Sequence, residues 1–143
     1  MSHSFDPQPP QGVVAAIVQG GRFLVIRRSV TVVAPRAWCF PGGAIEPGED
    51  QPTALMRELR EELRITVEPL RRLWRSVTPW GVSLAWWQAR LADDMVPHPN
   101  PAEVEAYRWC SPEEMAALRG LLESNRRFLA ALAAGEIELG DAC

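Results

Sequence analysis

The segment Gly43–Ile65, GAIEPGEDQPTALMRELREELRI, decides the fold because it joins a glycine turn to an amphipathic helix. Its leucines Leu55, Leu59 and Leu63 recur every four residues and predict one buried helical face. An acidic cap residue and a proline in the first turn place the start of this helix near Asp50–Pro52. The segment therefore predicts a helix that is anchored to the core and entered through a tight turn.

Three carboxylates, those of Glu58, Glu61 and Glu62, flank the leucine stripe of this predicted helix, whereas Arg57, Arg60 and Arg64 are expected toward its far side. At the helical repeat they fan over about 100° of one side, where like charges repel and destabilise the helix. Divalent cations such as Mg²⁺ relieve this repulsion, because they bind carboxylate oxygens and bridge them to substrate phosphates. The pattern therefore predicts a metal-dependent enzyme of phosphate chemistry.

The rest of the chain predicts one domain built on a mixed sheet. Its 143 residues suffice for a single core. Apolar, β-branched runs predict strands at 13–18, 22–28, 38–40, 70–78, 82–91 and 104–110. Helices are expected after the Ser111 cap and over 123–134, so that helices cover the faces of the sheet. We expect a flexible tail at 1–12, the domain at 13–135 and a second tail at 136–143.

The composition limits the kinds of binding partner and the cellular compartment that we expect for the protein. The net charge of −3 offers no overall attraction to a nucleic acid polymer, so none is expected as a partner. No apolar run approaches the roughly 20 residues of a membrane-spanning helix, and the first residues lack a signal-peptide core. The three cysteines are odd in number and far apart, which favours free thiols in a reducing compartment, the cytoplasm.

The spacing within and around the acidic helix resembles the sequence box of the Nudix hydrolase family. Gly43 is followed after five residues by Glu49 and after seven more by the run RELREELRI, which begins at Arg57. Every defined position of the box is matched except one, where Arg64 replaces a glycine. The lead-in WCFPGG and the later passage YRWCSPEE also resemble the family, so that the similarity covers most of residues 13–134.

The resemblance implies a fold and a catalytic set. The fold is an α/β/α sandwich, with helices on both faces of a mixed sheet. The activity is hydrolysis, dependent on Mg²⁺ or Mn²⁺, of a nucleoside diphosphate linked to another group. The implied metal ligands are Glu58, Glu61 and Glu62, one of which can instead be the general base, together with the Gly42 carbonyl. Glu49 and Arg57 are implied to pair and brace the loop against the helix.

Residues outside the box are candidates for binding the substrate. Arg27 and Arg28 alternate along a strand, so only one of them can face the cleft and hold a phosphate. Trp80, between a proline and a glycine, is the tryptophan expected to be exposed, where it can stack on a base. Glu103 or Glu105 can supply a fourth carboxylate, and we keep Glu105 as a substrate-binding candidate. The substrate stays open between a nucleoside triphosphate and a nucleotide-sugar such as ADP-ribose.

Three further expectations follow from the same residues. Arg64 is expected to cost local stability rather than activity, because a glycine after a helix end serves a left-handed cap. The six tryptophans are also compatible with a homodimer. The alternative function is a catalytically idle Nudix-like module that binds nucleotides or a protein, against which the intact carboxylate set argues.

Overall fold

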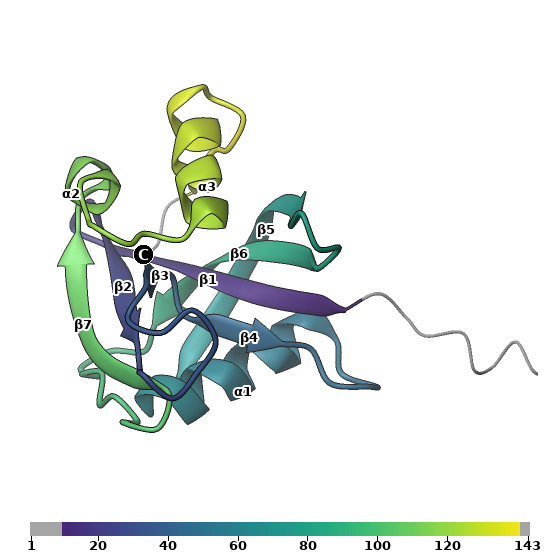
Figure 1. Cartoon of the computed structure of the whole chain (residues 1–143), viewed down its shortest axis with the longest axis vertical. Coiled ribbons are helices and arrows are strands. Elements are labelled where there is room, and N and C mark those ends of the chain that lie inside the picture. Colours follow the sequence, from purple (N-terminus) through teal and green to yellow (C-terminus); the bar gives the residue numbers. More distant parts are fainter. Residues whose placement is uncertain (1–9, 141–143) are drawn as a thin grey trace, which may run out of the picture.

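The computed structural model describes residues 10–140 and has a mixed, seven-stranded sheet with helices on both faces (Figure 1). Residues 1–9 and 141–143, which include Cys143, lie outside the described part. The strands are β1 (Gln11–Gln19), β2 (Arg22–Arg28), β3 (Trp38–Cys39), β4 (Gly42–Ala44), β5 (Val67–Val77), β6 (Ser83–Leu91) and β7 (Val104–Cys110). The helices are α1 (Gln51–Leu63), α2 (Pro112–Ala116) and α3 (Glu123–Ala133). The predicted fold class is confirmed.

The sheet is mixed because its two central strands are parallel while the other paired strands are antiparallel. Its main path runs β3-β2-β1-β6-β5, with β4 paired to β1 and β7 paired to β2. The parallel pair β1–β6 aligns Val14 with Trp86. In the antiparallel pair β1–β4, Val14 lies opposite Gly42. The short strand β4 thus extends the sheet directly into the turn that precedes α1.

Each face of the sheet is covered by its own hydrophobic core. On one face the stripe Leu55, Leu59 and Leu63 of α1 packs against a cluster that includes Ile17 and Ile26. The other core contains Phe128 of α3 and Met115 of α2, both fully buried among strand residues. These two layers place α1, with its carboxylates, on the opposite side of the sheet from α3 (Figure 1).

Helix α1 begins and ends as its sequence predicts. The Asp50 side chain caps the first turn by accepting a hydrogen bond of 2.9 Å from the Thr53 amide. At the other end Arg64 adopts the left-handed conformation, with φ 55° and ψ 37°, and its amide donates to the Arg60 carbonyl. A left-handed residue with a Cβ is strained, and this is the cost that was expected at the position where the family has glycine.

The structure differs from the sequence prediction at several element boundaries. Strand β4 was not predicted, and β5 begins at Val67, before Pro69, rather than at residue 70. The packed domain also extends past both predicted limits, because β1 begins at Gln11 and Ile137 is buried in the core. Gln88 holds Gly140, the last described residue: its side chain donates to the Gly140 carbonyl (2.7 Å) and accepts from the Gly140 amide (2.8 Å). Within residues 10–140 no helix is long and apolar enough to cross a membrane.

Candidate active site

Two of the predicted carboxylates, Glu58 and Glu62, lie one helical turn apart on α1 and are buried. Glu58 is 9% exposed and Glu62 is 6% exposed, because both adjoin the leucine stripe that packs against the sheet. The third, Glu61, points to the exposed side, with about half of its side chain accessible. The helix therefore directs two of its three carboxylates inward and leaves one at the rim.

The glycines before α1 bring the backbone of β4 against these two carboxylates. The Gly42 amide donates a hydrogen bond of 3.0 Å to Glu62 Oε1. A Cβ at residue 43 would lie 2.3 Å from Glu58 Oε2, so only glycine leaves room for that carboxylate. Strand β4 thus holds Glu62 by the hydrogen bond from Gly42 and leaves space for Glu58 at Gly43, which has no side chain.

A third carboxylate reaches the pair from a distant part of the chain. Glu103 immediately precedes β7, and its carboxylate oxygen lies with those of Glu58 and Glu62 within 4.8 Å of one another. Glu105, the other candidate, is elsewhere: it forms ion pairs with Arg27 at 3.5 Å and Arg36 at 3.6 Å. Of the two residues considered for a fourth carboxylate, the structure brings Glu103 and not Glu105 to the cluster.

Arg57 binds the acidic helix to the loop before it. Its Nε donates to Glu49 Oε2 at 2.6 Å and its Nη2 donates to Glu49 Oε1 at 2.9 Å. Its Nη1 donates to Glu58 Oε1 at 3.0 Å and to Glu61 Oε1 at 3.2 Å. The expected pairing with Glu49 is present, whereas the helical-wheel expectation that Arg57 lies on the far side of α1 is wrong. Hydrogen bonds from Arg57 lower the pKa of Glu49 to about 2, which keeps this brace ionised.

Burial and mutual repulsion disfavour the charged forms of the inner carboxylates. The pKa of Glu62 is raised well above its usual value, first by burial and then by the nearby charge of Glu58. Burial also raises the pKa of Glu58, although Arg57 opposes the shift. Ionised carboxylates in such a site are destabilised by burial and by their mutual repulsion. A divalent cation that neutralises them is therefore bound favourably. Oxygen ligands of this kind suit Mg²⁺ or Mn²⁺.

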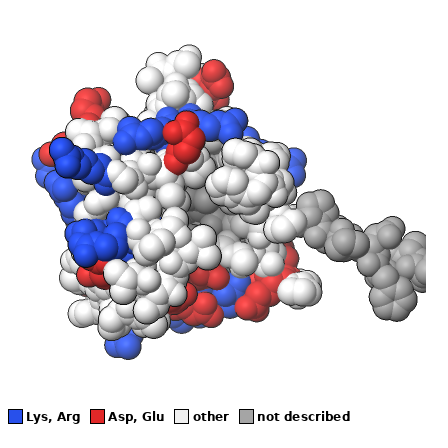
Figure 2. All heavy atoms as spheres, viewed as in Figure 1, with Lys and Arg blue, Asp and Glu red and all other residues white. Residues whose placement is uncertain are grey.

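A hollow of about 340 Å³ opens at β4. Gly42, whose amide bonds Glu62, and Gly43, which lies against Glu58, line this hollow, and Arg28 adds a cationic side chain. The carboxylates of Glu58, Glu62 and Glu103 do not line it. Arg27 does not line it, because its guanidinium lies over the Trp38 ring, 5.8 Å from the ring centroid. Of the two arginines, Arg28 is the one that lines this hollow, and its contact with a phosphate stays a prediction. Figure 2 shows a hollow at the centre of the face drawn, with acidic side chains gathered below it.

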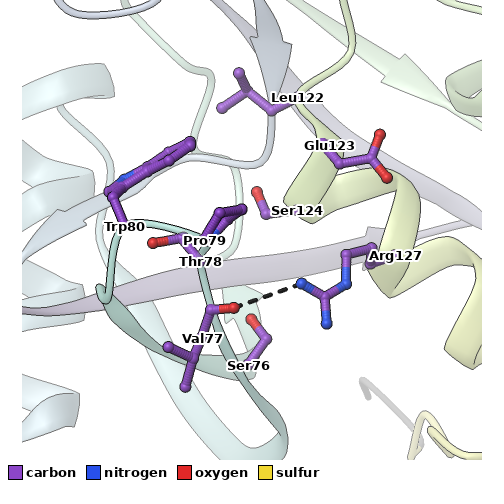
Figure 3. Close-up of a pocket in the computed structure, with 9 residues that line it drawn as sticks. All are labelled: Ser76, Val77, Thr78, Pro79, Trp80, Leu122, Glu123, Ser124 and Arg127. Atoms are coloured by element: carbon purple, nitrogen blue, oxygen red, sulfur yellow. Dashed lines mark hydrogen bonds between the residues drawn. The ribbon is translucent and has the colours of Figure 1, made fainter.

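A second, smaller pocket of about 140 Å³ adjoins this hollow and carries Trp80 at its rim. Leu122 and Ser124 line both spaces, which makes them neighbours. Trp80 is 77% exposed, as expected, and Figure 3 shows its indole on one side of the pocket and Arg127 on the other. The turn that carries Trp80 is tied to α3 by a hydrogen bond from Arg127 to the Val77 carbonyl (3.5 Å).

Two asparagines at the site were missed by the sequence analysis. Asn125, 3% exposed, lines the larger hollow and accepts a hydrogen bond of 2.9 Å from the Phe40 amide. Asn100 bonds both to the end of α1 and to Glu103. An asparagine in a loop or at a helix start has no distinctive spacing; only the Asn100-Pro101 pair gave a turn signal.

Known proteins resemble this chain along most of its length. The family model described as NUDIX domain matches residues 8–132. A CTP pyrophosphohydrolase of Escherichia coli is 38% identical over 107 residues, which cover 71% of this chain and 76% of that protein. A Nudix hydrolase of Deinococcus radiodurans is 32% identical over 105 residues, 70% of this chain but only 53% of the relative.

Solved structures agree with these sequence matches. A MutT NUDIX hydrolase of Burkholderia pseudomallei superposes with a TM-score of 0.72 at 27% identity, covering 87% of this chain and 98% of that one. The E. coli ORF135 protein gives a TM-score of 0.70 at 29% identity, with 89% and 90% covered. The likeness therefore includes the sheet, both helical layers and the helix that carries the carboxylates.

Proposed function

The chain belongs to the Nudix family of hydrolases, and from this premise we propose that it hydrolyses the phosphoanhydride bond of a nucleoside triphosphate with the aid of Mg²⁺ or Mn²⁺. The observation that carries the proposal is the convergence of Glu58, Glu62 and Glu103, whose oxygens lie within 4.8 Å of one another. The hollow lined by Gly42, Gly43 and Arg28 lies on the strand that contacts two of these carboxylates. Carboxylates and a nearby cationic side chain supply what pyrophosphate hydrolysis requires.

We assign the divalent cation to Glu58, Glu62 and Glu103, with the Gly42 carbonyl as a further oxygen ligand. Hard carboxylate oxygens that repel one another, two of them on buried residues, fit such a cation. Glu61 was also predicted as a ligand, but its carboxylate accepts a hydrogen bond from Arg57 at the exposed rim. To bind the same cation as Glu58, Glu62 and Glu103, the Glu61 carboxylate would have to break its hydrogen bond with Arg57. When bound, the cation supplies neutralisation of phosphate charge and acidification of a water molecule.

Side chains of the protein carry out the proton transfer and hold the substrate in position. A carboxylate that is not occupied by the cation accepts the proton of the attacking water. Which of Glu58, Glu61, Glu62 and Glu103 acts as the base stays open. Arg28 holds a phosphate oxygen in the hollow, and the Glu49–Arg57 brace fixes the direction of the carboxylates.

We place the nucleoside in the hollow beside Arg28, with its base directed toward the pocket of Trp80. The two spaces share Leu122 and Ser124, and an exposed indole offers a flat surface for a base. Base–aromatic stacking is worth about 1–3 kcal/mol. Trp80→Ala is therefore expected to raise KM about tenfold while leaving kcat similar, and Trp80→Phe, which keeps a ring, should stay near wild type. An unchanged KM in Trp80→Ala would remove Trp80 from the substrate site.

The substrate class is taken from a relative that is 38% identical over 71% of this chain. That protein is named a CTP pyrophosphohydrolase, which favours a nucleoside triphosphate over a nucleotide-sugar and makes CTP the first candidate. A relative from Erythrobacter litoralis is named an RNA pyrophosphohydrolase, but it aligns with only 57% of this chain. We keep the proposal for a small nucleotide. We also propose a cytoplasmic location, because Cys39 and Cys110 are buried, free thiols. Homodimer formation stays a prediction.

The test is a phosphate-release assay with Mg²⁺ or Mn²⁺ across nucleoside triphosphates, ADP-ribose, other nucleotide-sugars and dinucleoside polyphosphates. We expect hydrolysis of CTP or another nucleoside triphosphate, abolished by a chelator and by Glu62→Gln. Silence across the panel in a folded, Mn²⁺-loaded protein would favour the idle binding module. Strong hydrolysis of ADP-ribose alone would overturn the substrate class and retain the reaction.

A further inference from the structure

The carboxylate of Glu103 is held in place by a loop rather than by a helix or strand. Residues 92–103 connect β6 to β7, and Glu103 is the last residue before β7 begins. Glu58 and Glu62, in contrast, are fixed to each other by one turn of α1. The cluster keeps its geometry only if this loop is fastened to the helix, so the contacts of the loop determine where the third carboxylate lies.

The loop is fastened to the last three carbonyl groups of α1, which have no partner within the helix. The His98 amide donates to the Leu63 carbonyl at 2.8 Å, and the Asn100 amide donates to the Glu62 carbonyl at 2.8 Å. The Asn100 side-chain Nδ2 donates to the Glu61 carbonyl at 3.3 Å. Asn100 therefore supplies two of the three bonds, one of them through its side chain.

The same asparagine also holds Glu103. The Asn100 carbonyl accepts hydrogen bonds from the amides of Glu103 (2.9 Å) and Val104 (2.8 Å). Its Oδ1 accepts from the Ala102 amide at 3.2 Å, which closes the turn. Its Nδ2 donates to Glu103 Oε2 at 3.3 Å. One side chain thus contacts the backbone of the helix that carries two carboxylates and the third carboxylate itself.

We propose that Asn100 is a positioning residue, which fixes the Glu103 carboxylate relative to Glu58 and Glu62 and thereby strengthens the binding of a divalent cation by the cluster. The inference rests on the proposed function, since it takes the cluster as the cation site. An asparagine is needed because the position requires two donors and one acceptor at the same time. Aspartate would lose both donors and turn a negative charge toward Glu103.

The loss of a residue that orients a metal ligand typically weakens metal binding about 10–100-fold. We expect Asn100→Ala to raise the Kd for Mn²⁺ at least tenfold, measured as free Mn²⁺ by electron paramagnetic resonance without substrate. Asn100→Ser, which can still accept from the Ala102 amide but cannot reach Glu103, should show the same loss with a smaller change in Tm. His98→Ala is the matched control, since its side chain is exposed and its bond to α1 comes from the backbone.

A double-mutant cycle with Glu103→Gln separates positioning from general loop stability. If Asn100 acts through Glu103, Asn100→Ser should weaken Mn²⁺ binding in the wild-type background and add little in the Glu103→Gln background. An equal loss in both backgrounds, or no loss in either Asn100 variant, would overturn the inference. If Glu62→Gln also leaves Mn²⁺ binding unchanged, the proposed cation site itself fails, so the two failures are distinguishable.

Discussion

Replacing Glu62 with glutamine is expected to stabilise the cation-free protein while it abolishes hydrolysis. Glu62 is 6% exposed, and its pKa is raised first by burial and then by the charge of Glu58. Two unit charges 4.8 Å apart, the upper limit in the cluster, repel by about 3 kcal/mol at an effective dielectric constant of about 20. Arg57 offsets part of this repulsion by its hydrogen bond to Glu58.

The expected gain in the free energy of unfolding is therefore about 1–3 kcal/mol at neutral pH, or roughly 3–10 °C in Tm for a chain of this size. Glutamine keeps an oxygen that can accept from the Gly42 amide, so the bond of 3.0 Å need not be lost. Thermal unfolding in the presence of a chelator measures the gain. Glu136→Gln, at an exposed position after α3 on the other face of the sheet, is the matched control and should leave Tm unchanged.

The stability difference should also depend on pH in a fixed direction. Because the folded-state pKa of Glu62 lies above the unfolded value, the wild-type protein gains stability as pH falls from the raised pKa toward the ordinary value for glutamate. The advantage of Glu62→Gln should therefore be largest at neutral pH and fade near the ordinary value. Saturating Mn²⁺ should reverse the order, since the cation stabilises only the form that binds it. A lower Tm for Glu62→Gln at neutral pH with chelator would refute the reasoning.

Two further substitutions test other parts of the account. Arg64→Gly removes a Cβ from a left-handed residue, so we expect Tm to rise by an amount equivalent to about 1 kcal/mol with kcat unchanged; a fall in Tm or a large gain in activity would contradict this. Arg57→Lys keeps the charge but loses the two-bond contact with Glu49, so we expect kcat to fall about tenfold or more with the fold intact by circular dichroism. Full activity in Arg57→Lys would show that the charge alone suffices.

The secondary structure was predicted most accurately where one short segment of sequence contains all the residues that define the element. Helix α1 has its cap, its leucine stripe and its carboxylates within one run, and the structure agrees with the cap and the stripe but turns only two of the three carboxylates inward. Strand β4 was missed because two glycines and an alanine give no strand pattern; its pairing depends on β1, which is distant in sequence. The start of β5 was predicted too late because Pro69 was read as the limit of the strand. The structure includes Pro69 in β5, since a proline is tolerated in an edge strand.

Contacts between distant segments, and the reach of long side chains, account for the errors at the site. Glu103 and Glu105 are equally acidic and two residues apart, and only the path of the loop decides that Glu103 meets α1. Arg57 was assigned to the far side by its angle on the helix, yet its long side chain reaches Glu49 and Glu58. Ile137 lies two residues after Gly135, beyond the expected end of the last helix, so a segment that is buried was predicted as part of a tail.

A Mn²⁺ titration of CTP hydrolysis in the wild type and in Glu103→Gln tests the cation site, with Glu105→Gln as the matched control. We assign the cation to Glu103, whereas Glu105 pairs with arginines, although the two residues are separated only by Val104. We expect Glu103→Gln to raise the Mn²⁺ concentration for half-maximal hydrolysis about tenfold or more and Glu105→Gln to leave it unchanged. Equal curves for Glu103→Gln and the wild type would contradict the assignment of the cation site.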